Sequence, residues 1–172
     1  PTPAAFLAKA EIAEWPLLGK AASKAGTVFV ERSSGTSRDR ARRAVGEKLG
    51  AGQQVVVFPE GTTYRGPGCG RFKRGAFYAA AEARVPVVPV AIEYPDPRMA
   101  WVEDDTFLKH FARSFGGDRI EVHVHFGPTF HGLAPEEMCE AANDWVSTRL
   151  LQLWDDVVLT SDPASSGRTI WD

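Results

Sequence analysis

Several polar residues in this chain stand beside short apolar runs, and their types suit the binding of an anion. The stretch VVVFPEGTT, residues 55–63, passes from three valines into a polar turn, TVFVER ends in Arg32, and FKRG spans residues 72–75. An arginine offers a fork for two oxygens and a lysine a point charge, so a phosphate monoester is the simplest ligand. We expect the substrate to be bound by Lys9, Arg32, Glu60, Gly61, Thr62, Thr63 and Lys73.

Glu60 is the anomalous member of a cationic set. It could order the arginines or accept a hydrogen bond from a substrate hydroxyl, and we expect it to be charged and paired with Arg32 or Arg65. Pro-Glu-Gly is also a good turn sequence, so Glu60 and Gly61 could simply shape the chain. Both roles are compatible with each other.

The other candidates have simpler interpretations as well. Arg32 alone would read as a surface arginine, and Lys73 with Arg74 as a solvated helix start, although cations in a first turn oppose the helix dipole. His123 and His125 alternate on one face of a predicted strand, but a metal needs further ligands and none is evident in the sequence, so ordinary strand histidines are favoured.

The elements that must position these residues follow from periodicity. Helices are predicted at 11–25, 38–49 with Ser37 as its cap, 75–84, 105–115 and 135–153, and strands at 27–31, 54–58, 85–93 and 119–126. This alternation predicts an α/β fold with a mostly parallel central sheet flanked by helices. The strand 54–58, apolar on both faces, is expected inside that sheet, and chemistry is expected just beyond the carboxyl ends of the strands.

Composition excludes several classes of protein. A net charge of −2 over 172 residues argues against a nucleic-acid-binding surface. Cys69 and Cys139 give neither a disulfide framework nor a metal pattern, which suits a reducing compartment. No apolar run approaches the roughly 18–20 residues of a spanning helix. We expect one domain over residues 1–154 and a polar, loosely held tail over 155–172.

The motifs GTVFVER, FPEGTT, FKRGAF and VPVVPVAI, in this order, resemble signature blocks of the PlsC-like glycerolipid acyltransferase family. The resemblance covers about residues 4–130 and includes the AK-E sequence, whose lysine is Lys9 here. It implies a glycerol-3-phosphate acyltransferase-like fold and acyl transfer from acyl-CoA or acyl-carrier protein to the free hydroxyl of a lysophosphatidate. Beyond that acyl donor as co-substrate, it implies no cofactor and no metal.

The resemblance also implies a general-base block, a histidine followed five positions later by an aspartate, upstream of Lys9. None of His110, His123 and His125 has such an aspartate, and His131 is followed by Glu136 and lies too late in the chain. We therefore expect the catalytic His and Asp upstream of Pro1 and no acyltransferase activity from these 172 residues alone. The chain's opening, which lacks a helix cap, agrees with an N-terminally incomplete domain.

A lysophosphatidate lies in a bilayer, so the resemblance implies peripheral docking at the cytoplasmic face of the cell membrane. The segment 99–115 carries aromatic and basic residues that suit an interface, and equally a helix packed into the core. Two other functions stay open: a non-catalytic module that binds a phospholipid or acyl-CoA, and a phosphate-ester hydrolase. The hydrolase lacks an identifiable nucleophile or metal cluster.

Replacing Arg32 tests the phosphate-binding interpretation. A charge-assisted hydrogen bond contributes about 1.5–3 kcal/mol. In an active protein that contains this chain, Arg32→Ala should therefore raise the KM for the acceptor roughly ten-fold or more before it affects the donor, measured by thioester consumption. Unchanged dependence on the acceptor would rule the assignment out.

Overall fold

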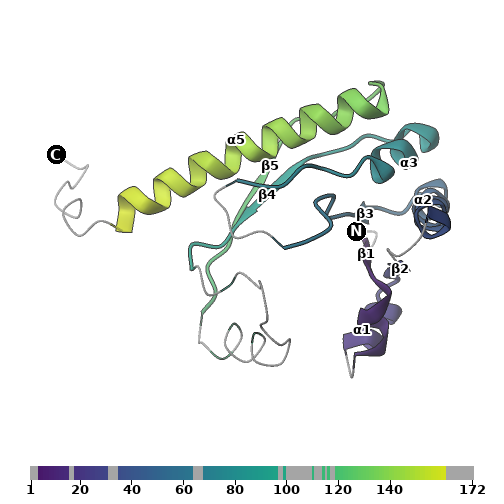
Figure 1. The fold of residues 1–172 in the computed structure, drawn as a ribbon, viewed down its shortest axis with the longest axis horizontal. Helices are drawn as coiled ribbons and strands as arrows, with labels where there is room; N and C mark the ends of the chain where they lie inside the picture. Colours follow the sequence, from purple (N-terminus) through teal and green to yellow (C-terminus); the bar gives the residue numbers. More distant parts are fainter. Residues whose placement is uncertain are drawn as a thin grey trace. The chain divides into compact units, whose positions relative to one another are not determined.

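The computed structural model describes residues 4–15, 18–30, 35–63, 68–96, 99, 110, 114, 116 and 119–161 (Figure 1). Contacts divide the chain into two compact units, and each is described by itself. The first comprises Pro1–Gly61, Phe72–Val87 and Thr129–Glu140, and the second Thr62–Arg71, Val88–Pro128 and Ala141–Asp172.

The first unit contains a three-stranded parallel sheet. Its strands are β1 (Ala5–Lys9), β2 (Val28–Val30) and β3 (Val55–Val56), in the order β2-β1-β3. The register places Lys9 beside Val30 and Ala5 beside Val55. Because all three strands run in the same direction, their carboxyl ends meet at one edge. The α/β class and the parallel sheet expected from the sequence are confirmed.

Strand β1 was not predicted, yet it is the central strand of this sheet. The strand predicted over 54–58 is only Val55–Val56, and in the described part of the sheet it pairs with β1 alone, so its interior place stays a prediction. The physical reason for its early end is that Pro59 has no N–H to donate and the chain is already turning at Phe58.

The first predicted helix is two separate pieces. A 3₁₀ helix, η1 (Ala10–Glu14), ends at Trp15, whose backbone is extended, and α1 (Leu18–Lys24) follows. A residue that precedes a proline disfavours the helical region, which accounts for the break at Trp15. The next helix, α2 (Gly35–Gly50), begins earlier than predicted, so Ser37 lies inside it and is not its cap.

Helix α3 (Gly75–Ala83) agrees with the helix predicted at 75–84, and Arg84 ends it in a left-handed conformation. Helix α2 packs against β2, β3 and α3. Since α2 and α3 lie against each other, they bury a small apolar core. Its most buried members in the first unit are Ala5, Val45, Phe77, Ala79, Ala80, Met138 and Cys139.

The second unit contains an antiparallel pair, β4 (Val90–Glu93) and β5 (His123–Phe126), in which Ala91 lies beside His125. Both strands are shorter than the predicted 85–93 and 119–126. Pro86 and Pro89 cannot donate to a ladder, so regular pairing starts only after them. Between the two prolines, within the first unit, Val87 makes an isolated bridge to Phe130.

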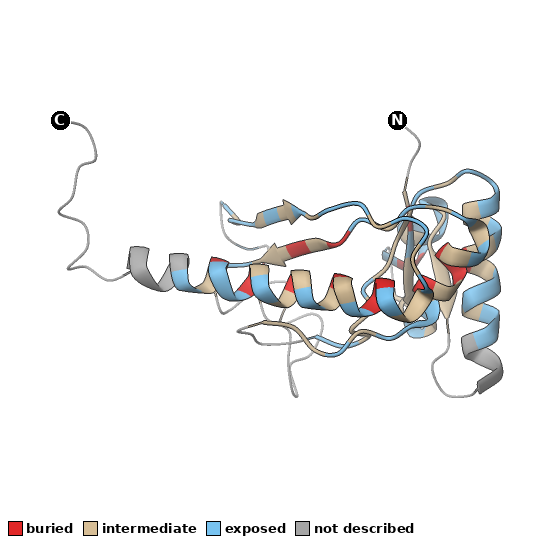
Figure 2. Ribbon diagram, turned by 90° about the horizontal axis from the view of Figure 1, so that it is seen from above, coloured by how far each residue is buried: buried red, intermediate tan, exposed pale blue. Residues whose placement is uncertain are grey.

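Helix α5 (Pro135–Ser161) begins where predicted and continues past Leu153. Its buried residues recur along one side of the helix, as Figure 2 shows, with the spacing of an amphipathic helix. They are Met138, Cys139, Ala142, Val146, Leu150 and Leu153. Of the helix predicted at 105–115, only His110 and Ser114 are described. The tail expected over 155–172 is helical at 155–161, as part of α5, and residues 162–172 lie outside the described residues.

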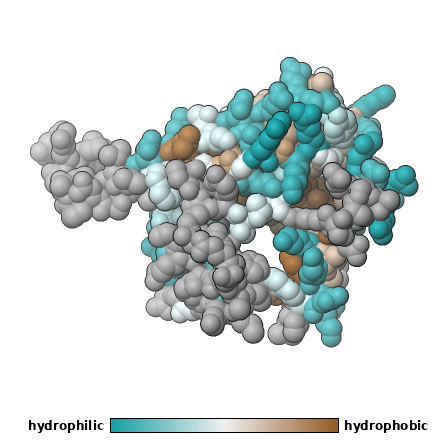
Figure 3. Space-filling view, viewed as in Figure 1, coloured by the Kyte–Doolittle hydropathy of each residue, from teal (hydrophilic) through white to brown (hydrophobic). Residues whose placement is uncertain are grey.

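Within the described ranges, no helix combines the length and the apolarity that crossing a bilayer requires. On the face drawn in Figure 3, hydrophilic residues cover most of the coloured surface and apolar ones show in separate patches. The interface predicted at 99–115 is described only at Met99, His110 and Ser114, so it stays a prediction.

The buried side of α5 can be tested with two substitutions on the same helix. Met138 is 1% exposed, so Met138→Ala should lower the free energy of unfolding by about 2–5 kcal/mol through lost burial and a cavity. Leu151 is 48% exposed, and Leu151→Ala should change it by less than about 0.5 kcal/mol. Urea denaturation measures both, and equal losses would contradict the assigned side of the helix.

Candidate functional site

The site is built around the turn that follows β3. The Gly61 N–H donates to the carbonyl of Phe58 at 3.2 Å, which closes a four-residue turn with Pro59 at its second position. Proline there and glycine at the fourth position are the residues that such a turn prefers. Gly61 has φ 71°, in the left-handed region that favours glycine. Local sequence alone therefore explains this turn.

Lys73 reaches this turn from a distant part of the chain. Its backbone N–H donates to the Pro59 carbonyl at 2.8 Å. Its side chain lies across Gly61: a Cβ added there would stand 2.9 Å from Lys73 Cε and 3.2 Å from Cδ, and closer still to the ammonium. The ammonium is therefore brought to the end of β3, and the missing side chain of Gly61 leaves the room for it.

Lys9 lies at the same edge of the sheet. It is the last residue of β1, is exposed, and stands beside Val30, two positions before Arg32. Because β1 and β3 are parallel neighbours, Lys9 at the end of β1 and the Phe58–Gly61 turn after β3 lie at the same edge. The arrangement places positive charge where an anionic substrate is expected in an α/β sheet.

The structure does not place every predicted site residue. Arg32 and Arg65 lie outside the described residues, so the pairing of Glu60 with either stays a prediction. Glu60 itself is partly buried and follows Pro59 in the turn. Thr62 and Thr63 are exposed and belong to the second unit. Of the predicted site residues, Gly61 and Lys73 are the pair that the structure places side by side.

The strand histidines of the second unit have partners of their own. His123 Nε2 lies 3.0 Å from Glu121, and Arg149 donates to His125 Nδ1 at 2.9 Å. A guanidinium only donates, so Nδ1 of His125 is the acceptor of that bond. Burial raises the pKa of Glu93, which pairs with His123 in the ladder. Among the described residues, no group of three His, Cys, Asp or Glu could hold a metal ion.

Sequence reasoning missed two contributions to the site. The Pro59 carbonyl, which accepts the bond from Lys73, gives no sequence signal, because any residue carries a carbonyl. Strand β1, which carries Lys9, had only the weak signal of a short apolar run, AAFLA, directly before the lysine. That run lacks the β-branched residues that marked the other strands.

With this geometry in place, the chain can be compared with known proteins. A sequence profile described as Acyltransferase matches residues 1–93. The match covers more than half of the chain, and the chain belongs to the acyltransferase family. The resemblance implied by FPEGTT and FKRG is thereby confirmed.

Two bacterial acyltransferases are similar to this chain in sequence. The chain is 42% identical over 127 residues to a lyso-ornithine lipid O-acyltransferase of Pseudomonas aeruginosa, covering 71% of this chain and 49% of that protein. It is 45% identical over 94 residues to a 1-acyl-sn-glycerol-3-phosphate acyltransferase of Neisseria gonorrhoeae, covering 55% of this chain and 37% of that protein. The chain thus spans half or less of the length of these relatives.

The fold is also similar to a solved structure, the 1-acyl-sn-glycerophosphate acyltransferase PlsC from Thermotoga maritima. The TM-score is 0.60 at 24% sequence identity, over 88% of this chain and 57% of that one. At this identity the likeness establishes the fold alone. It agrees with the α/β class read from the sequence.

Two glycines with nearly the same positive φ test the role of Gly61. Gly61 (φ 71°) faces Lys73, whereas Gly52 (φ 74°) has nothing within 4 Å of an added Cβ. Either glycine-to-alanine change should cost about 1–2 kcal/mol of stability through its left-handed backbone. Gly61→Ala should also displace the Lys73 ammonium and raise the acceptor KM, whereas Gly52→Ala should not. Equal effects on KM would show that strain alone is responsible.

Proposed function

We propose that this chain forms the acceptor-binding part of an O-acyltransferase that esterifies the free hydroxyl of an anionic lysolipid, with lysophosphatidate as the acceptor. The observation that carries the proposal is the Lys73 ammonium lying against Gly61 in the turn after β3. A cation there, with Lys9 at the same edge, suits a phosphate that must be held while a hydroxyl nearby reacts. Family membership supplies the reaction class.

In the proposed reaction the acceptor oxygen attacks the thioester carbonyl of acyl-CoA or acyl-carrier protein. The carbon–sulfur bond breaks, a base takes the hydroxyl proton, and the thiol leaves protonated. We propose that the base is a histidine outside these 172 residues, because no histidine within them is followed by the expected aspartate. Lys9, Arg32 and Lys73 bind the phosphate and so orient the hydroxyl.

A second acceptor is favoured by a specific observation. The match to the lyso-ornithine lipid O-acyltransferase covers 71% of this chain, a larger share than the 55% matched by the glycerophosphate enzyme. An ornithine headgroup offers a carboxylate where lysophosphatidate offers a phosphate. Lysines and an arginine can bind either anion. Turnover measured with each lysolipid therefore decides which one is the acceptor.

The experiment uses the protein made from the complete reading frame that contains this chain. Thiol release from acyl-CoA is followed with lysophosphatidate, with lyso-ornithine lipid and with no acceptor. Lys73→Met should raise the KM for the preferred acceptor about ten-fold or more, as expected for loss of a charge-assisted contact, at nearly unchanged donor KM. Lys24→Met, an exposed lysine on α1, is the matched control and should change neither.

Two results would contradict the proposal. Acceptor-independent thiol release would indicate a thioester hydrolase. Binding of the lysolipid with no thiol release in any arm would indicate a non-catalytic lipid-binding module, the alternative left open by the sequence.

A further inference from the structure

A network of polar contacts in the first unit connects α2, α3 and the first turns of α5. Arg74, Tyr78 and Glu82 are spaced four residues apart along α3 and its start, so they lie on one face of the helix. Glu136 and Glu140 have the same spacing at the start of α5. Matching periods allow several contacts to form in register between the two helices.

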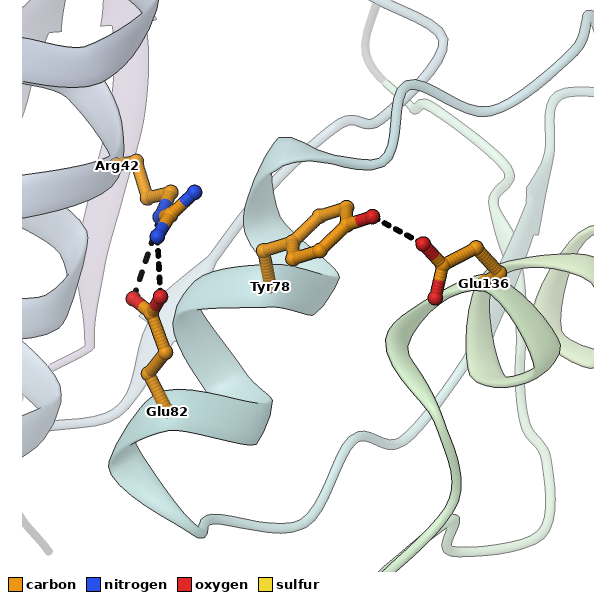
Figure 4. A network of polar contacts seen from close by, with 4 residues as sticks. All are labelled: Arg42, Tyr78, Glu82 and Glu136. Atoms are coloured by element: carbon orange, nitrogen blue, oxygen red, sulfur yellow. Dashed lines mark hydrogen bonds and ion pairs between the residues drawn. The ribbon is translucent and has the colours of Figure 1, made fainter.

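The centre of this network is Tyr78 (Figure 4). Its hydroxyl donates to Glu136, and the guanidinium of Arg42 on α2 lies 5.6 Å from the centre of its ring. Arg42 also holds Glu82 through both oxygens of the carboxylate, with Nε 3.2 Å from Oε2. Arg74 lies 3.6 Å from Glu140. Tyr78 thus contacts residues of both α2 and α5.

The protonation states of the central pair are mutually consistent. The hydrogen bond to Glu136 raises the pKa of Tyr78, and the same bond lowers the pKa of Glu136. The phenol therefore stays a donor and the carboxylate an ionised acceptor across neutral pH. Exposed ion pairs such as Arg42 with Glu82 contribute little to the free energy of unfolding. The effect of the network is therefore sought in the orientation of α3.

Helix α3 begins at Gly75, directly after Lys73 and Arg74. The two cations of the FKRG sequence point to different partners: Lys73 lies against Gly61, and Arg74 contacts Glu140. A rotation of α3 about its axis would therefore move Lys73 relative to the turn after β3. The contacts of Tyr78, one turn along the helix, oppose such a rotation.

We propose that Tyr78 is a positioning residue for Lys73: through its hydroxyl on Glu136 and its ring under Arg42, it fixes the orientation of α3 and holds the Lys73 ammonium at Gly61. The inference rests on the proposed function, in which Lys73 binds the acceptor's anionic group. A residue that only stabilised the fold would affect all lysines alike. The positioning role predicts a change at Lys73 in particular.

The first test measures that lysine directly in the full-length protein. Acetylation by an amine-reactive ester, followed by peptide mass spectrometry, gives the modification rate of each lysine. Tyr78→Phe keeps the ring and removes the hydroxyl, so Lys73 should react about two- to five-fold faster while exposed Lys24 reacts at its original rate. Tyr94→Phe, an exposed tyrosine of the second unit, is the matched control and should leave Lys73 unchanged.

The second test is kinetic. Tyr78→Phe should raise the acceptor KM about three- to ten-fold with kcat and donor KM nearly unchanged, and Tyr94→Phe should not. An unchanged Lys73 rate, or a rise at all lysines together with a lower melting temperature, overturns the inference. If the wild-type protein transfers no acyl chain, the proposed function fails, and the acetylation rates still decide whether Tyr78 positions Lys73.

Discussion

The backbone hydrogen bond from Lys73 to the Pro59 carbonyl joins the two segments on which the candidate site depends. It connects the end of β3 with the start of α3, across residues that belong to the other unit. Contacts that orient α3 therefore also affect where Lys73 lies relative to the turn. The bond thus helps to keep the Lys73 ammonium close to Gly61.

The turn itself combines two requirements at one glycine. Gly61 adopts a positive φ, which any side chain would strain, and it leaves room for the aliphatic part of Lys73. The first requirement is local and the second is tertiary. Their coincidence explains why a glycine suits this position better than asparagine, which tolerates the backbone but would occupy the space.

The acyltransferase assignment fits the direction of the sheet. Three parallel strands end at one edge of the sheet. Segments that are far apart in sequence, such as Lys9 and the Phe58–Gly61 turn, therefore come together at that edge. Binding an anion at such an edge while leaving a hydroxyl free is a problem of orientation, and cations held by neighbouring secondary structure can solve it. The network around Tyr78 connects α3, whose start carries Lys73, to α2 and α5.

The sequence by itself determined the α/β class, helix α3 and the start of α5, because regular apolar spacing and turn residues act locally. It also determined the family, since FPEGT together with the preceding F-x-x-R, residues 29–32, is a specific combination of motifs. Only the tertiary structure decided that Ala5–Lys9 is the central strand: this run is weakly β-forming and is ordered by pairing with β2 and β3. The contacts of Lys73 with Gly61 and of Tyr78 with Glu136 were decided there too, because they join residues whose separation in sequence carries no periodic signal.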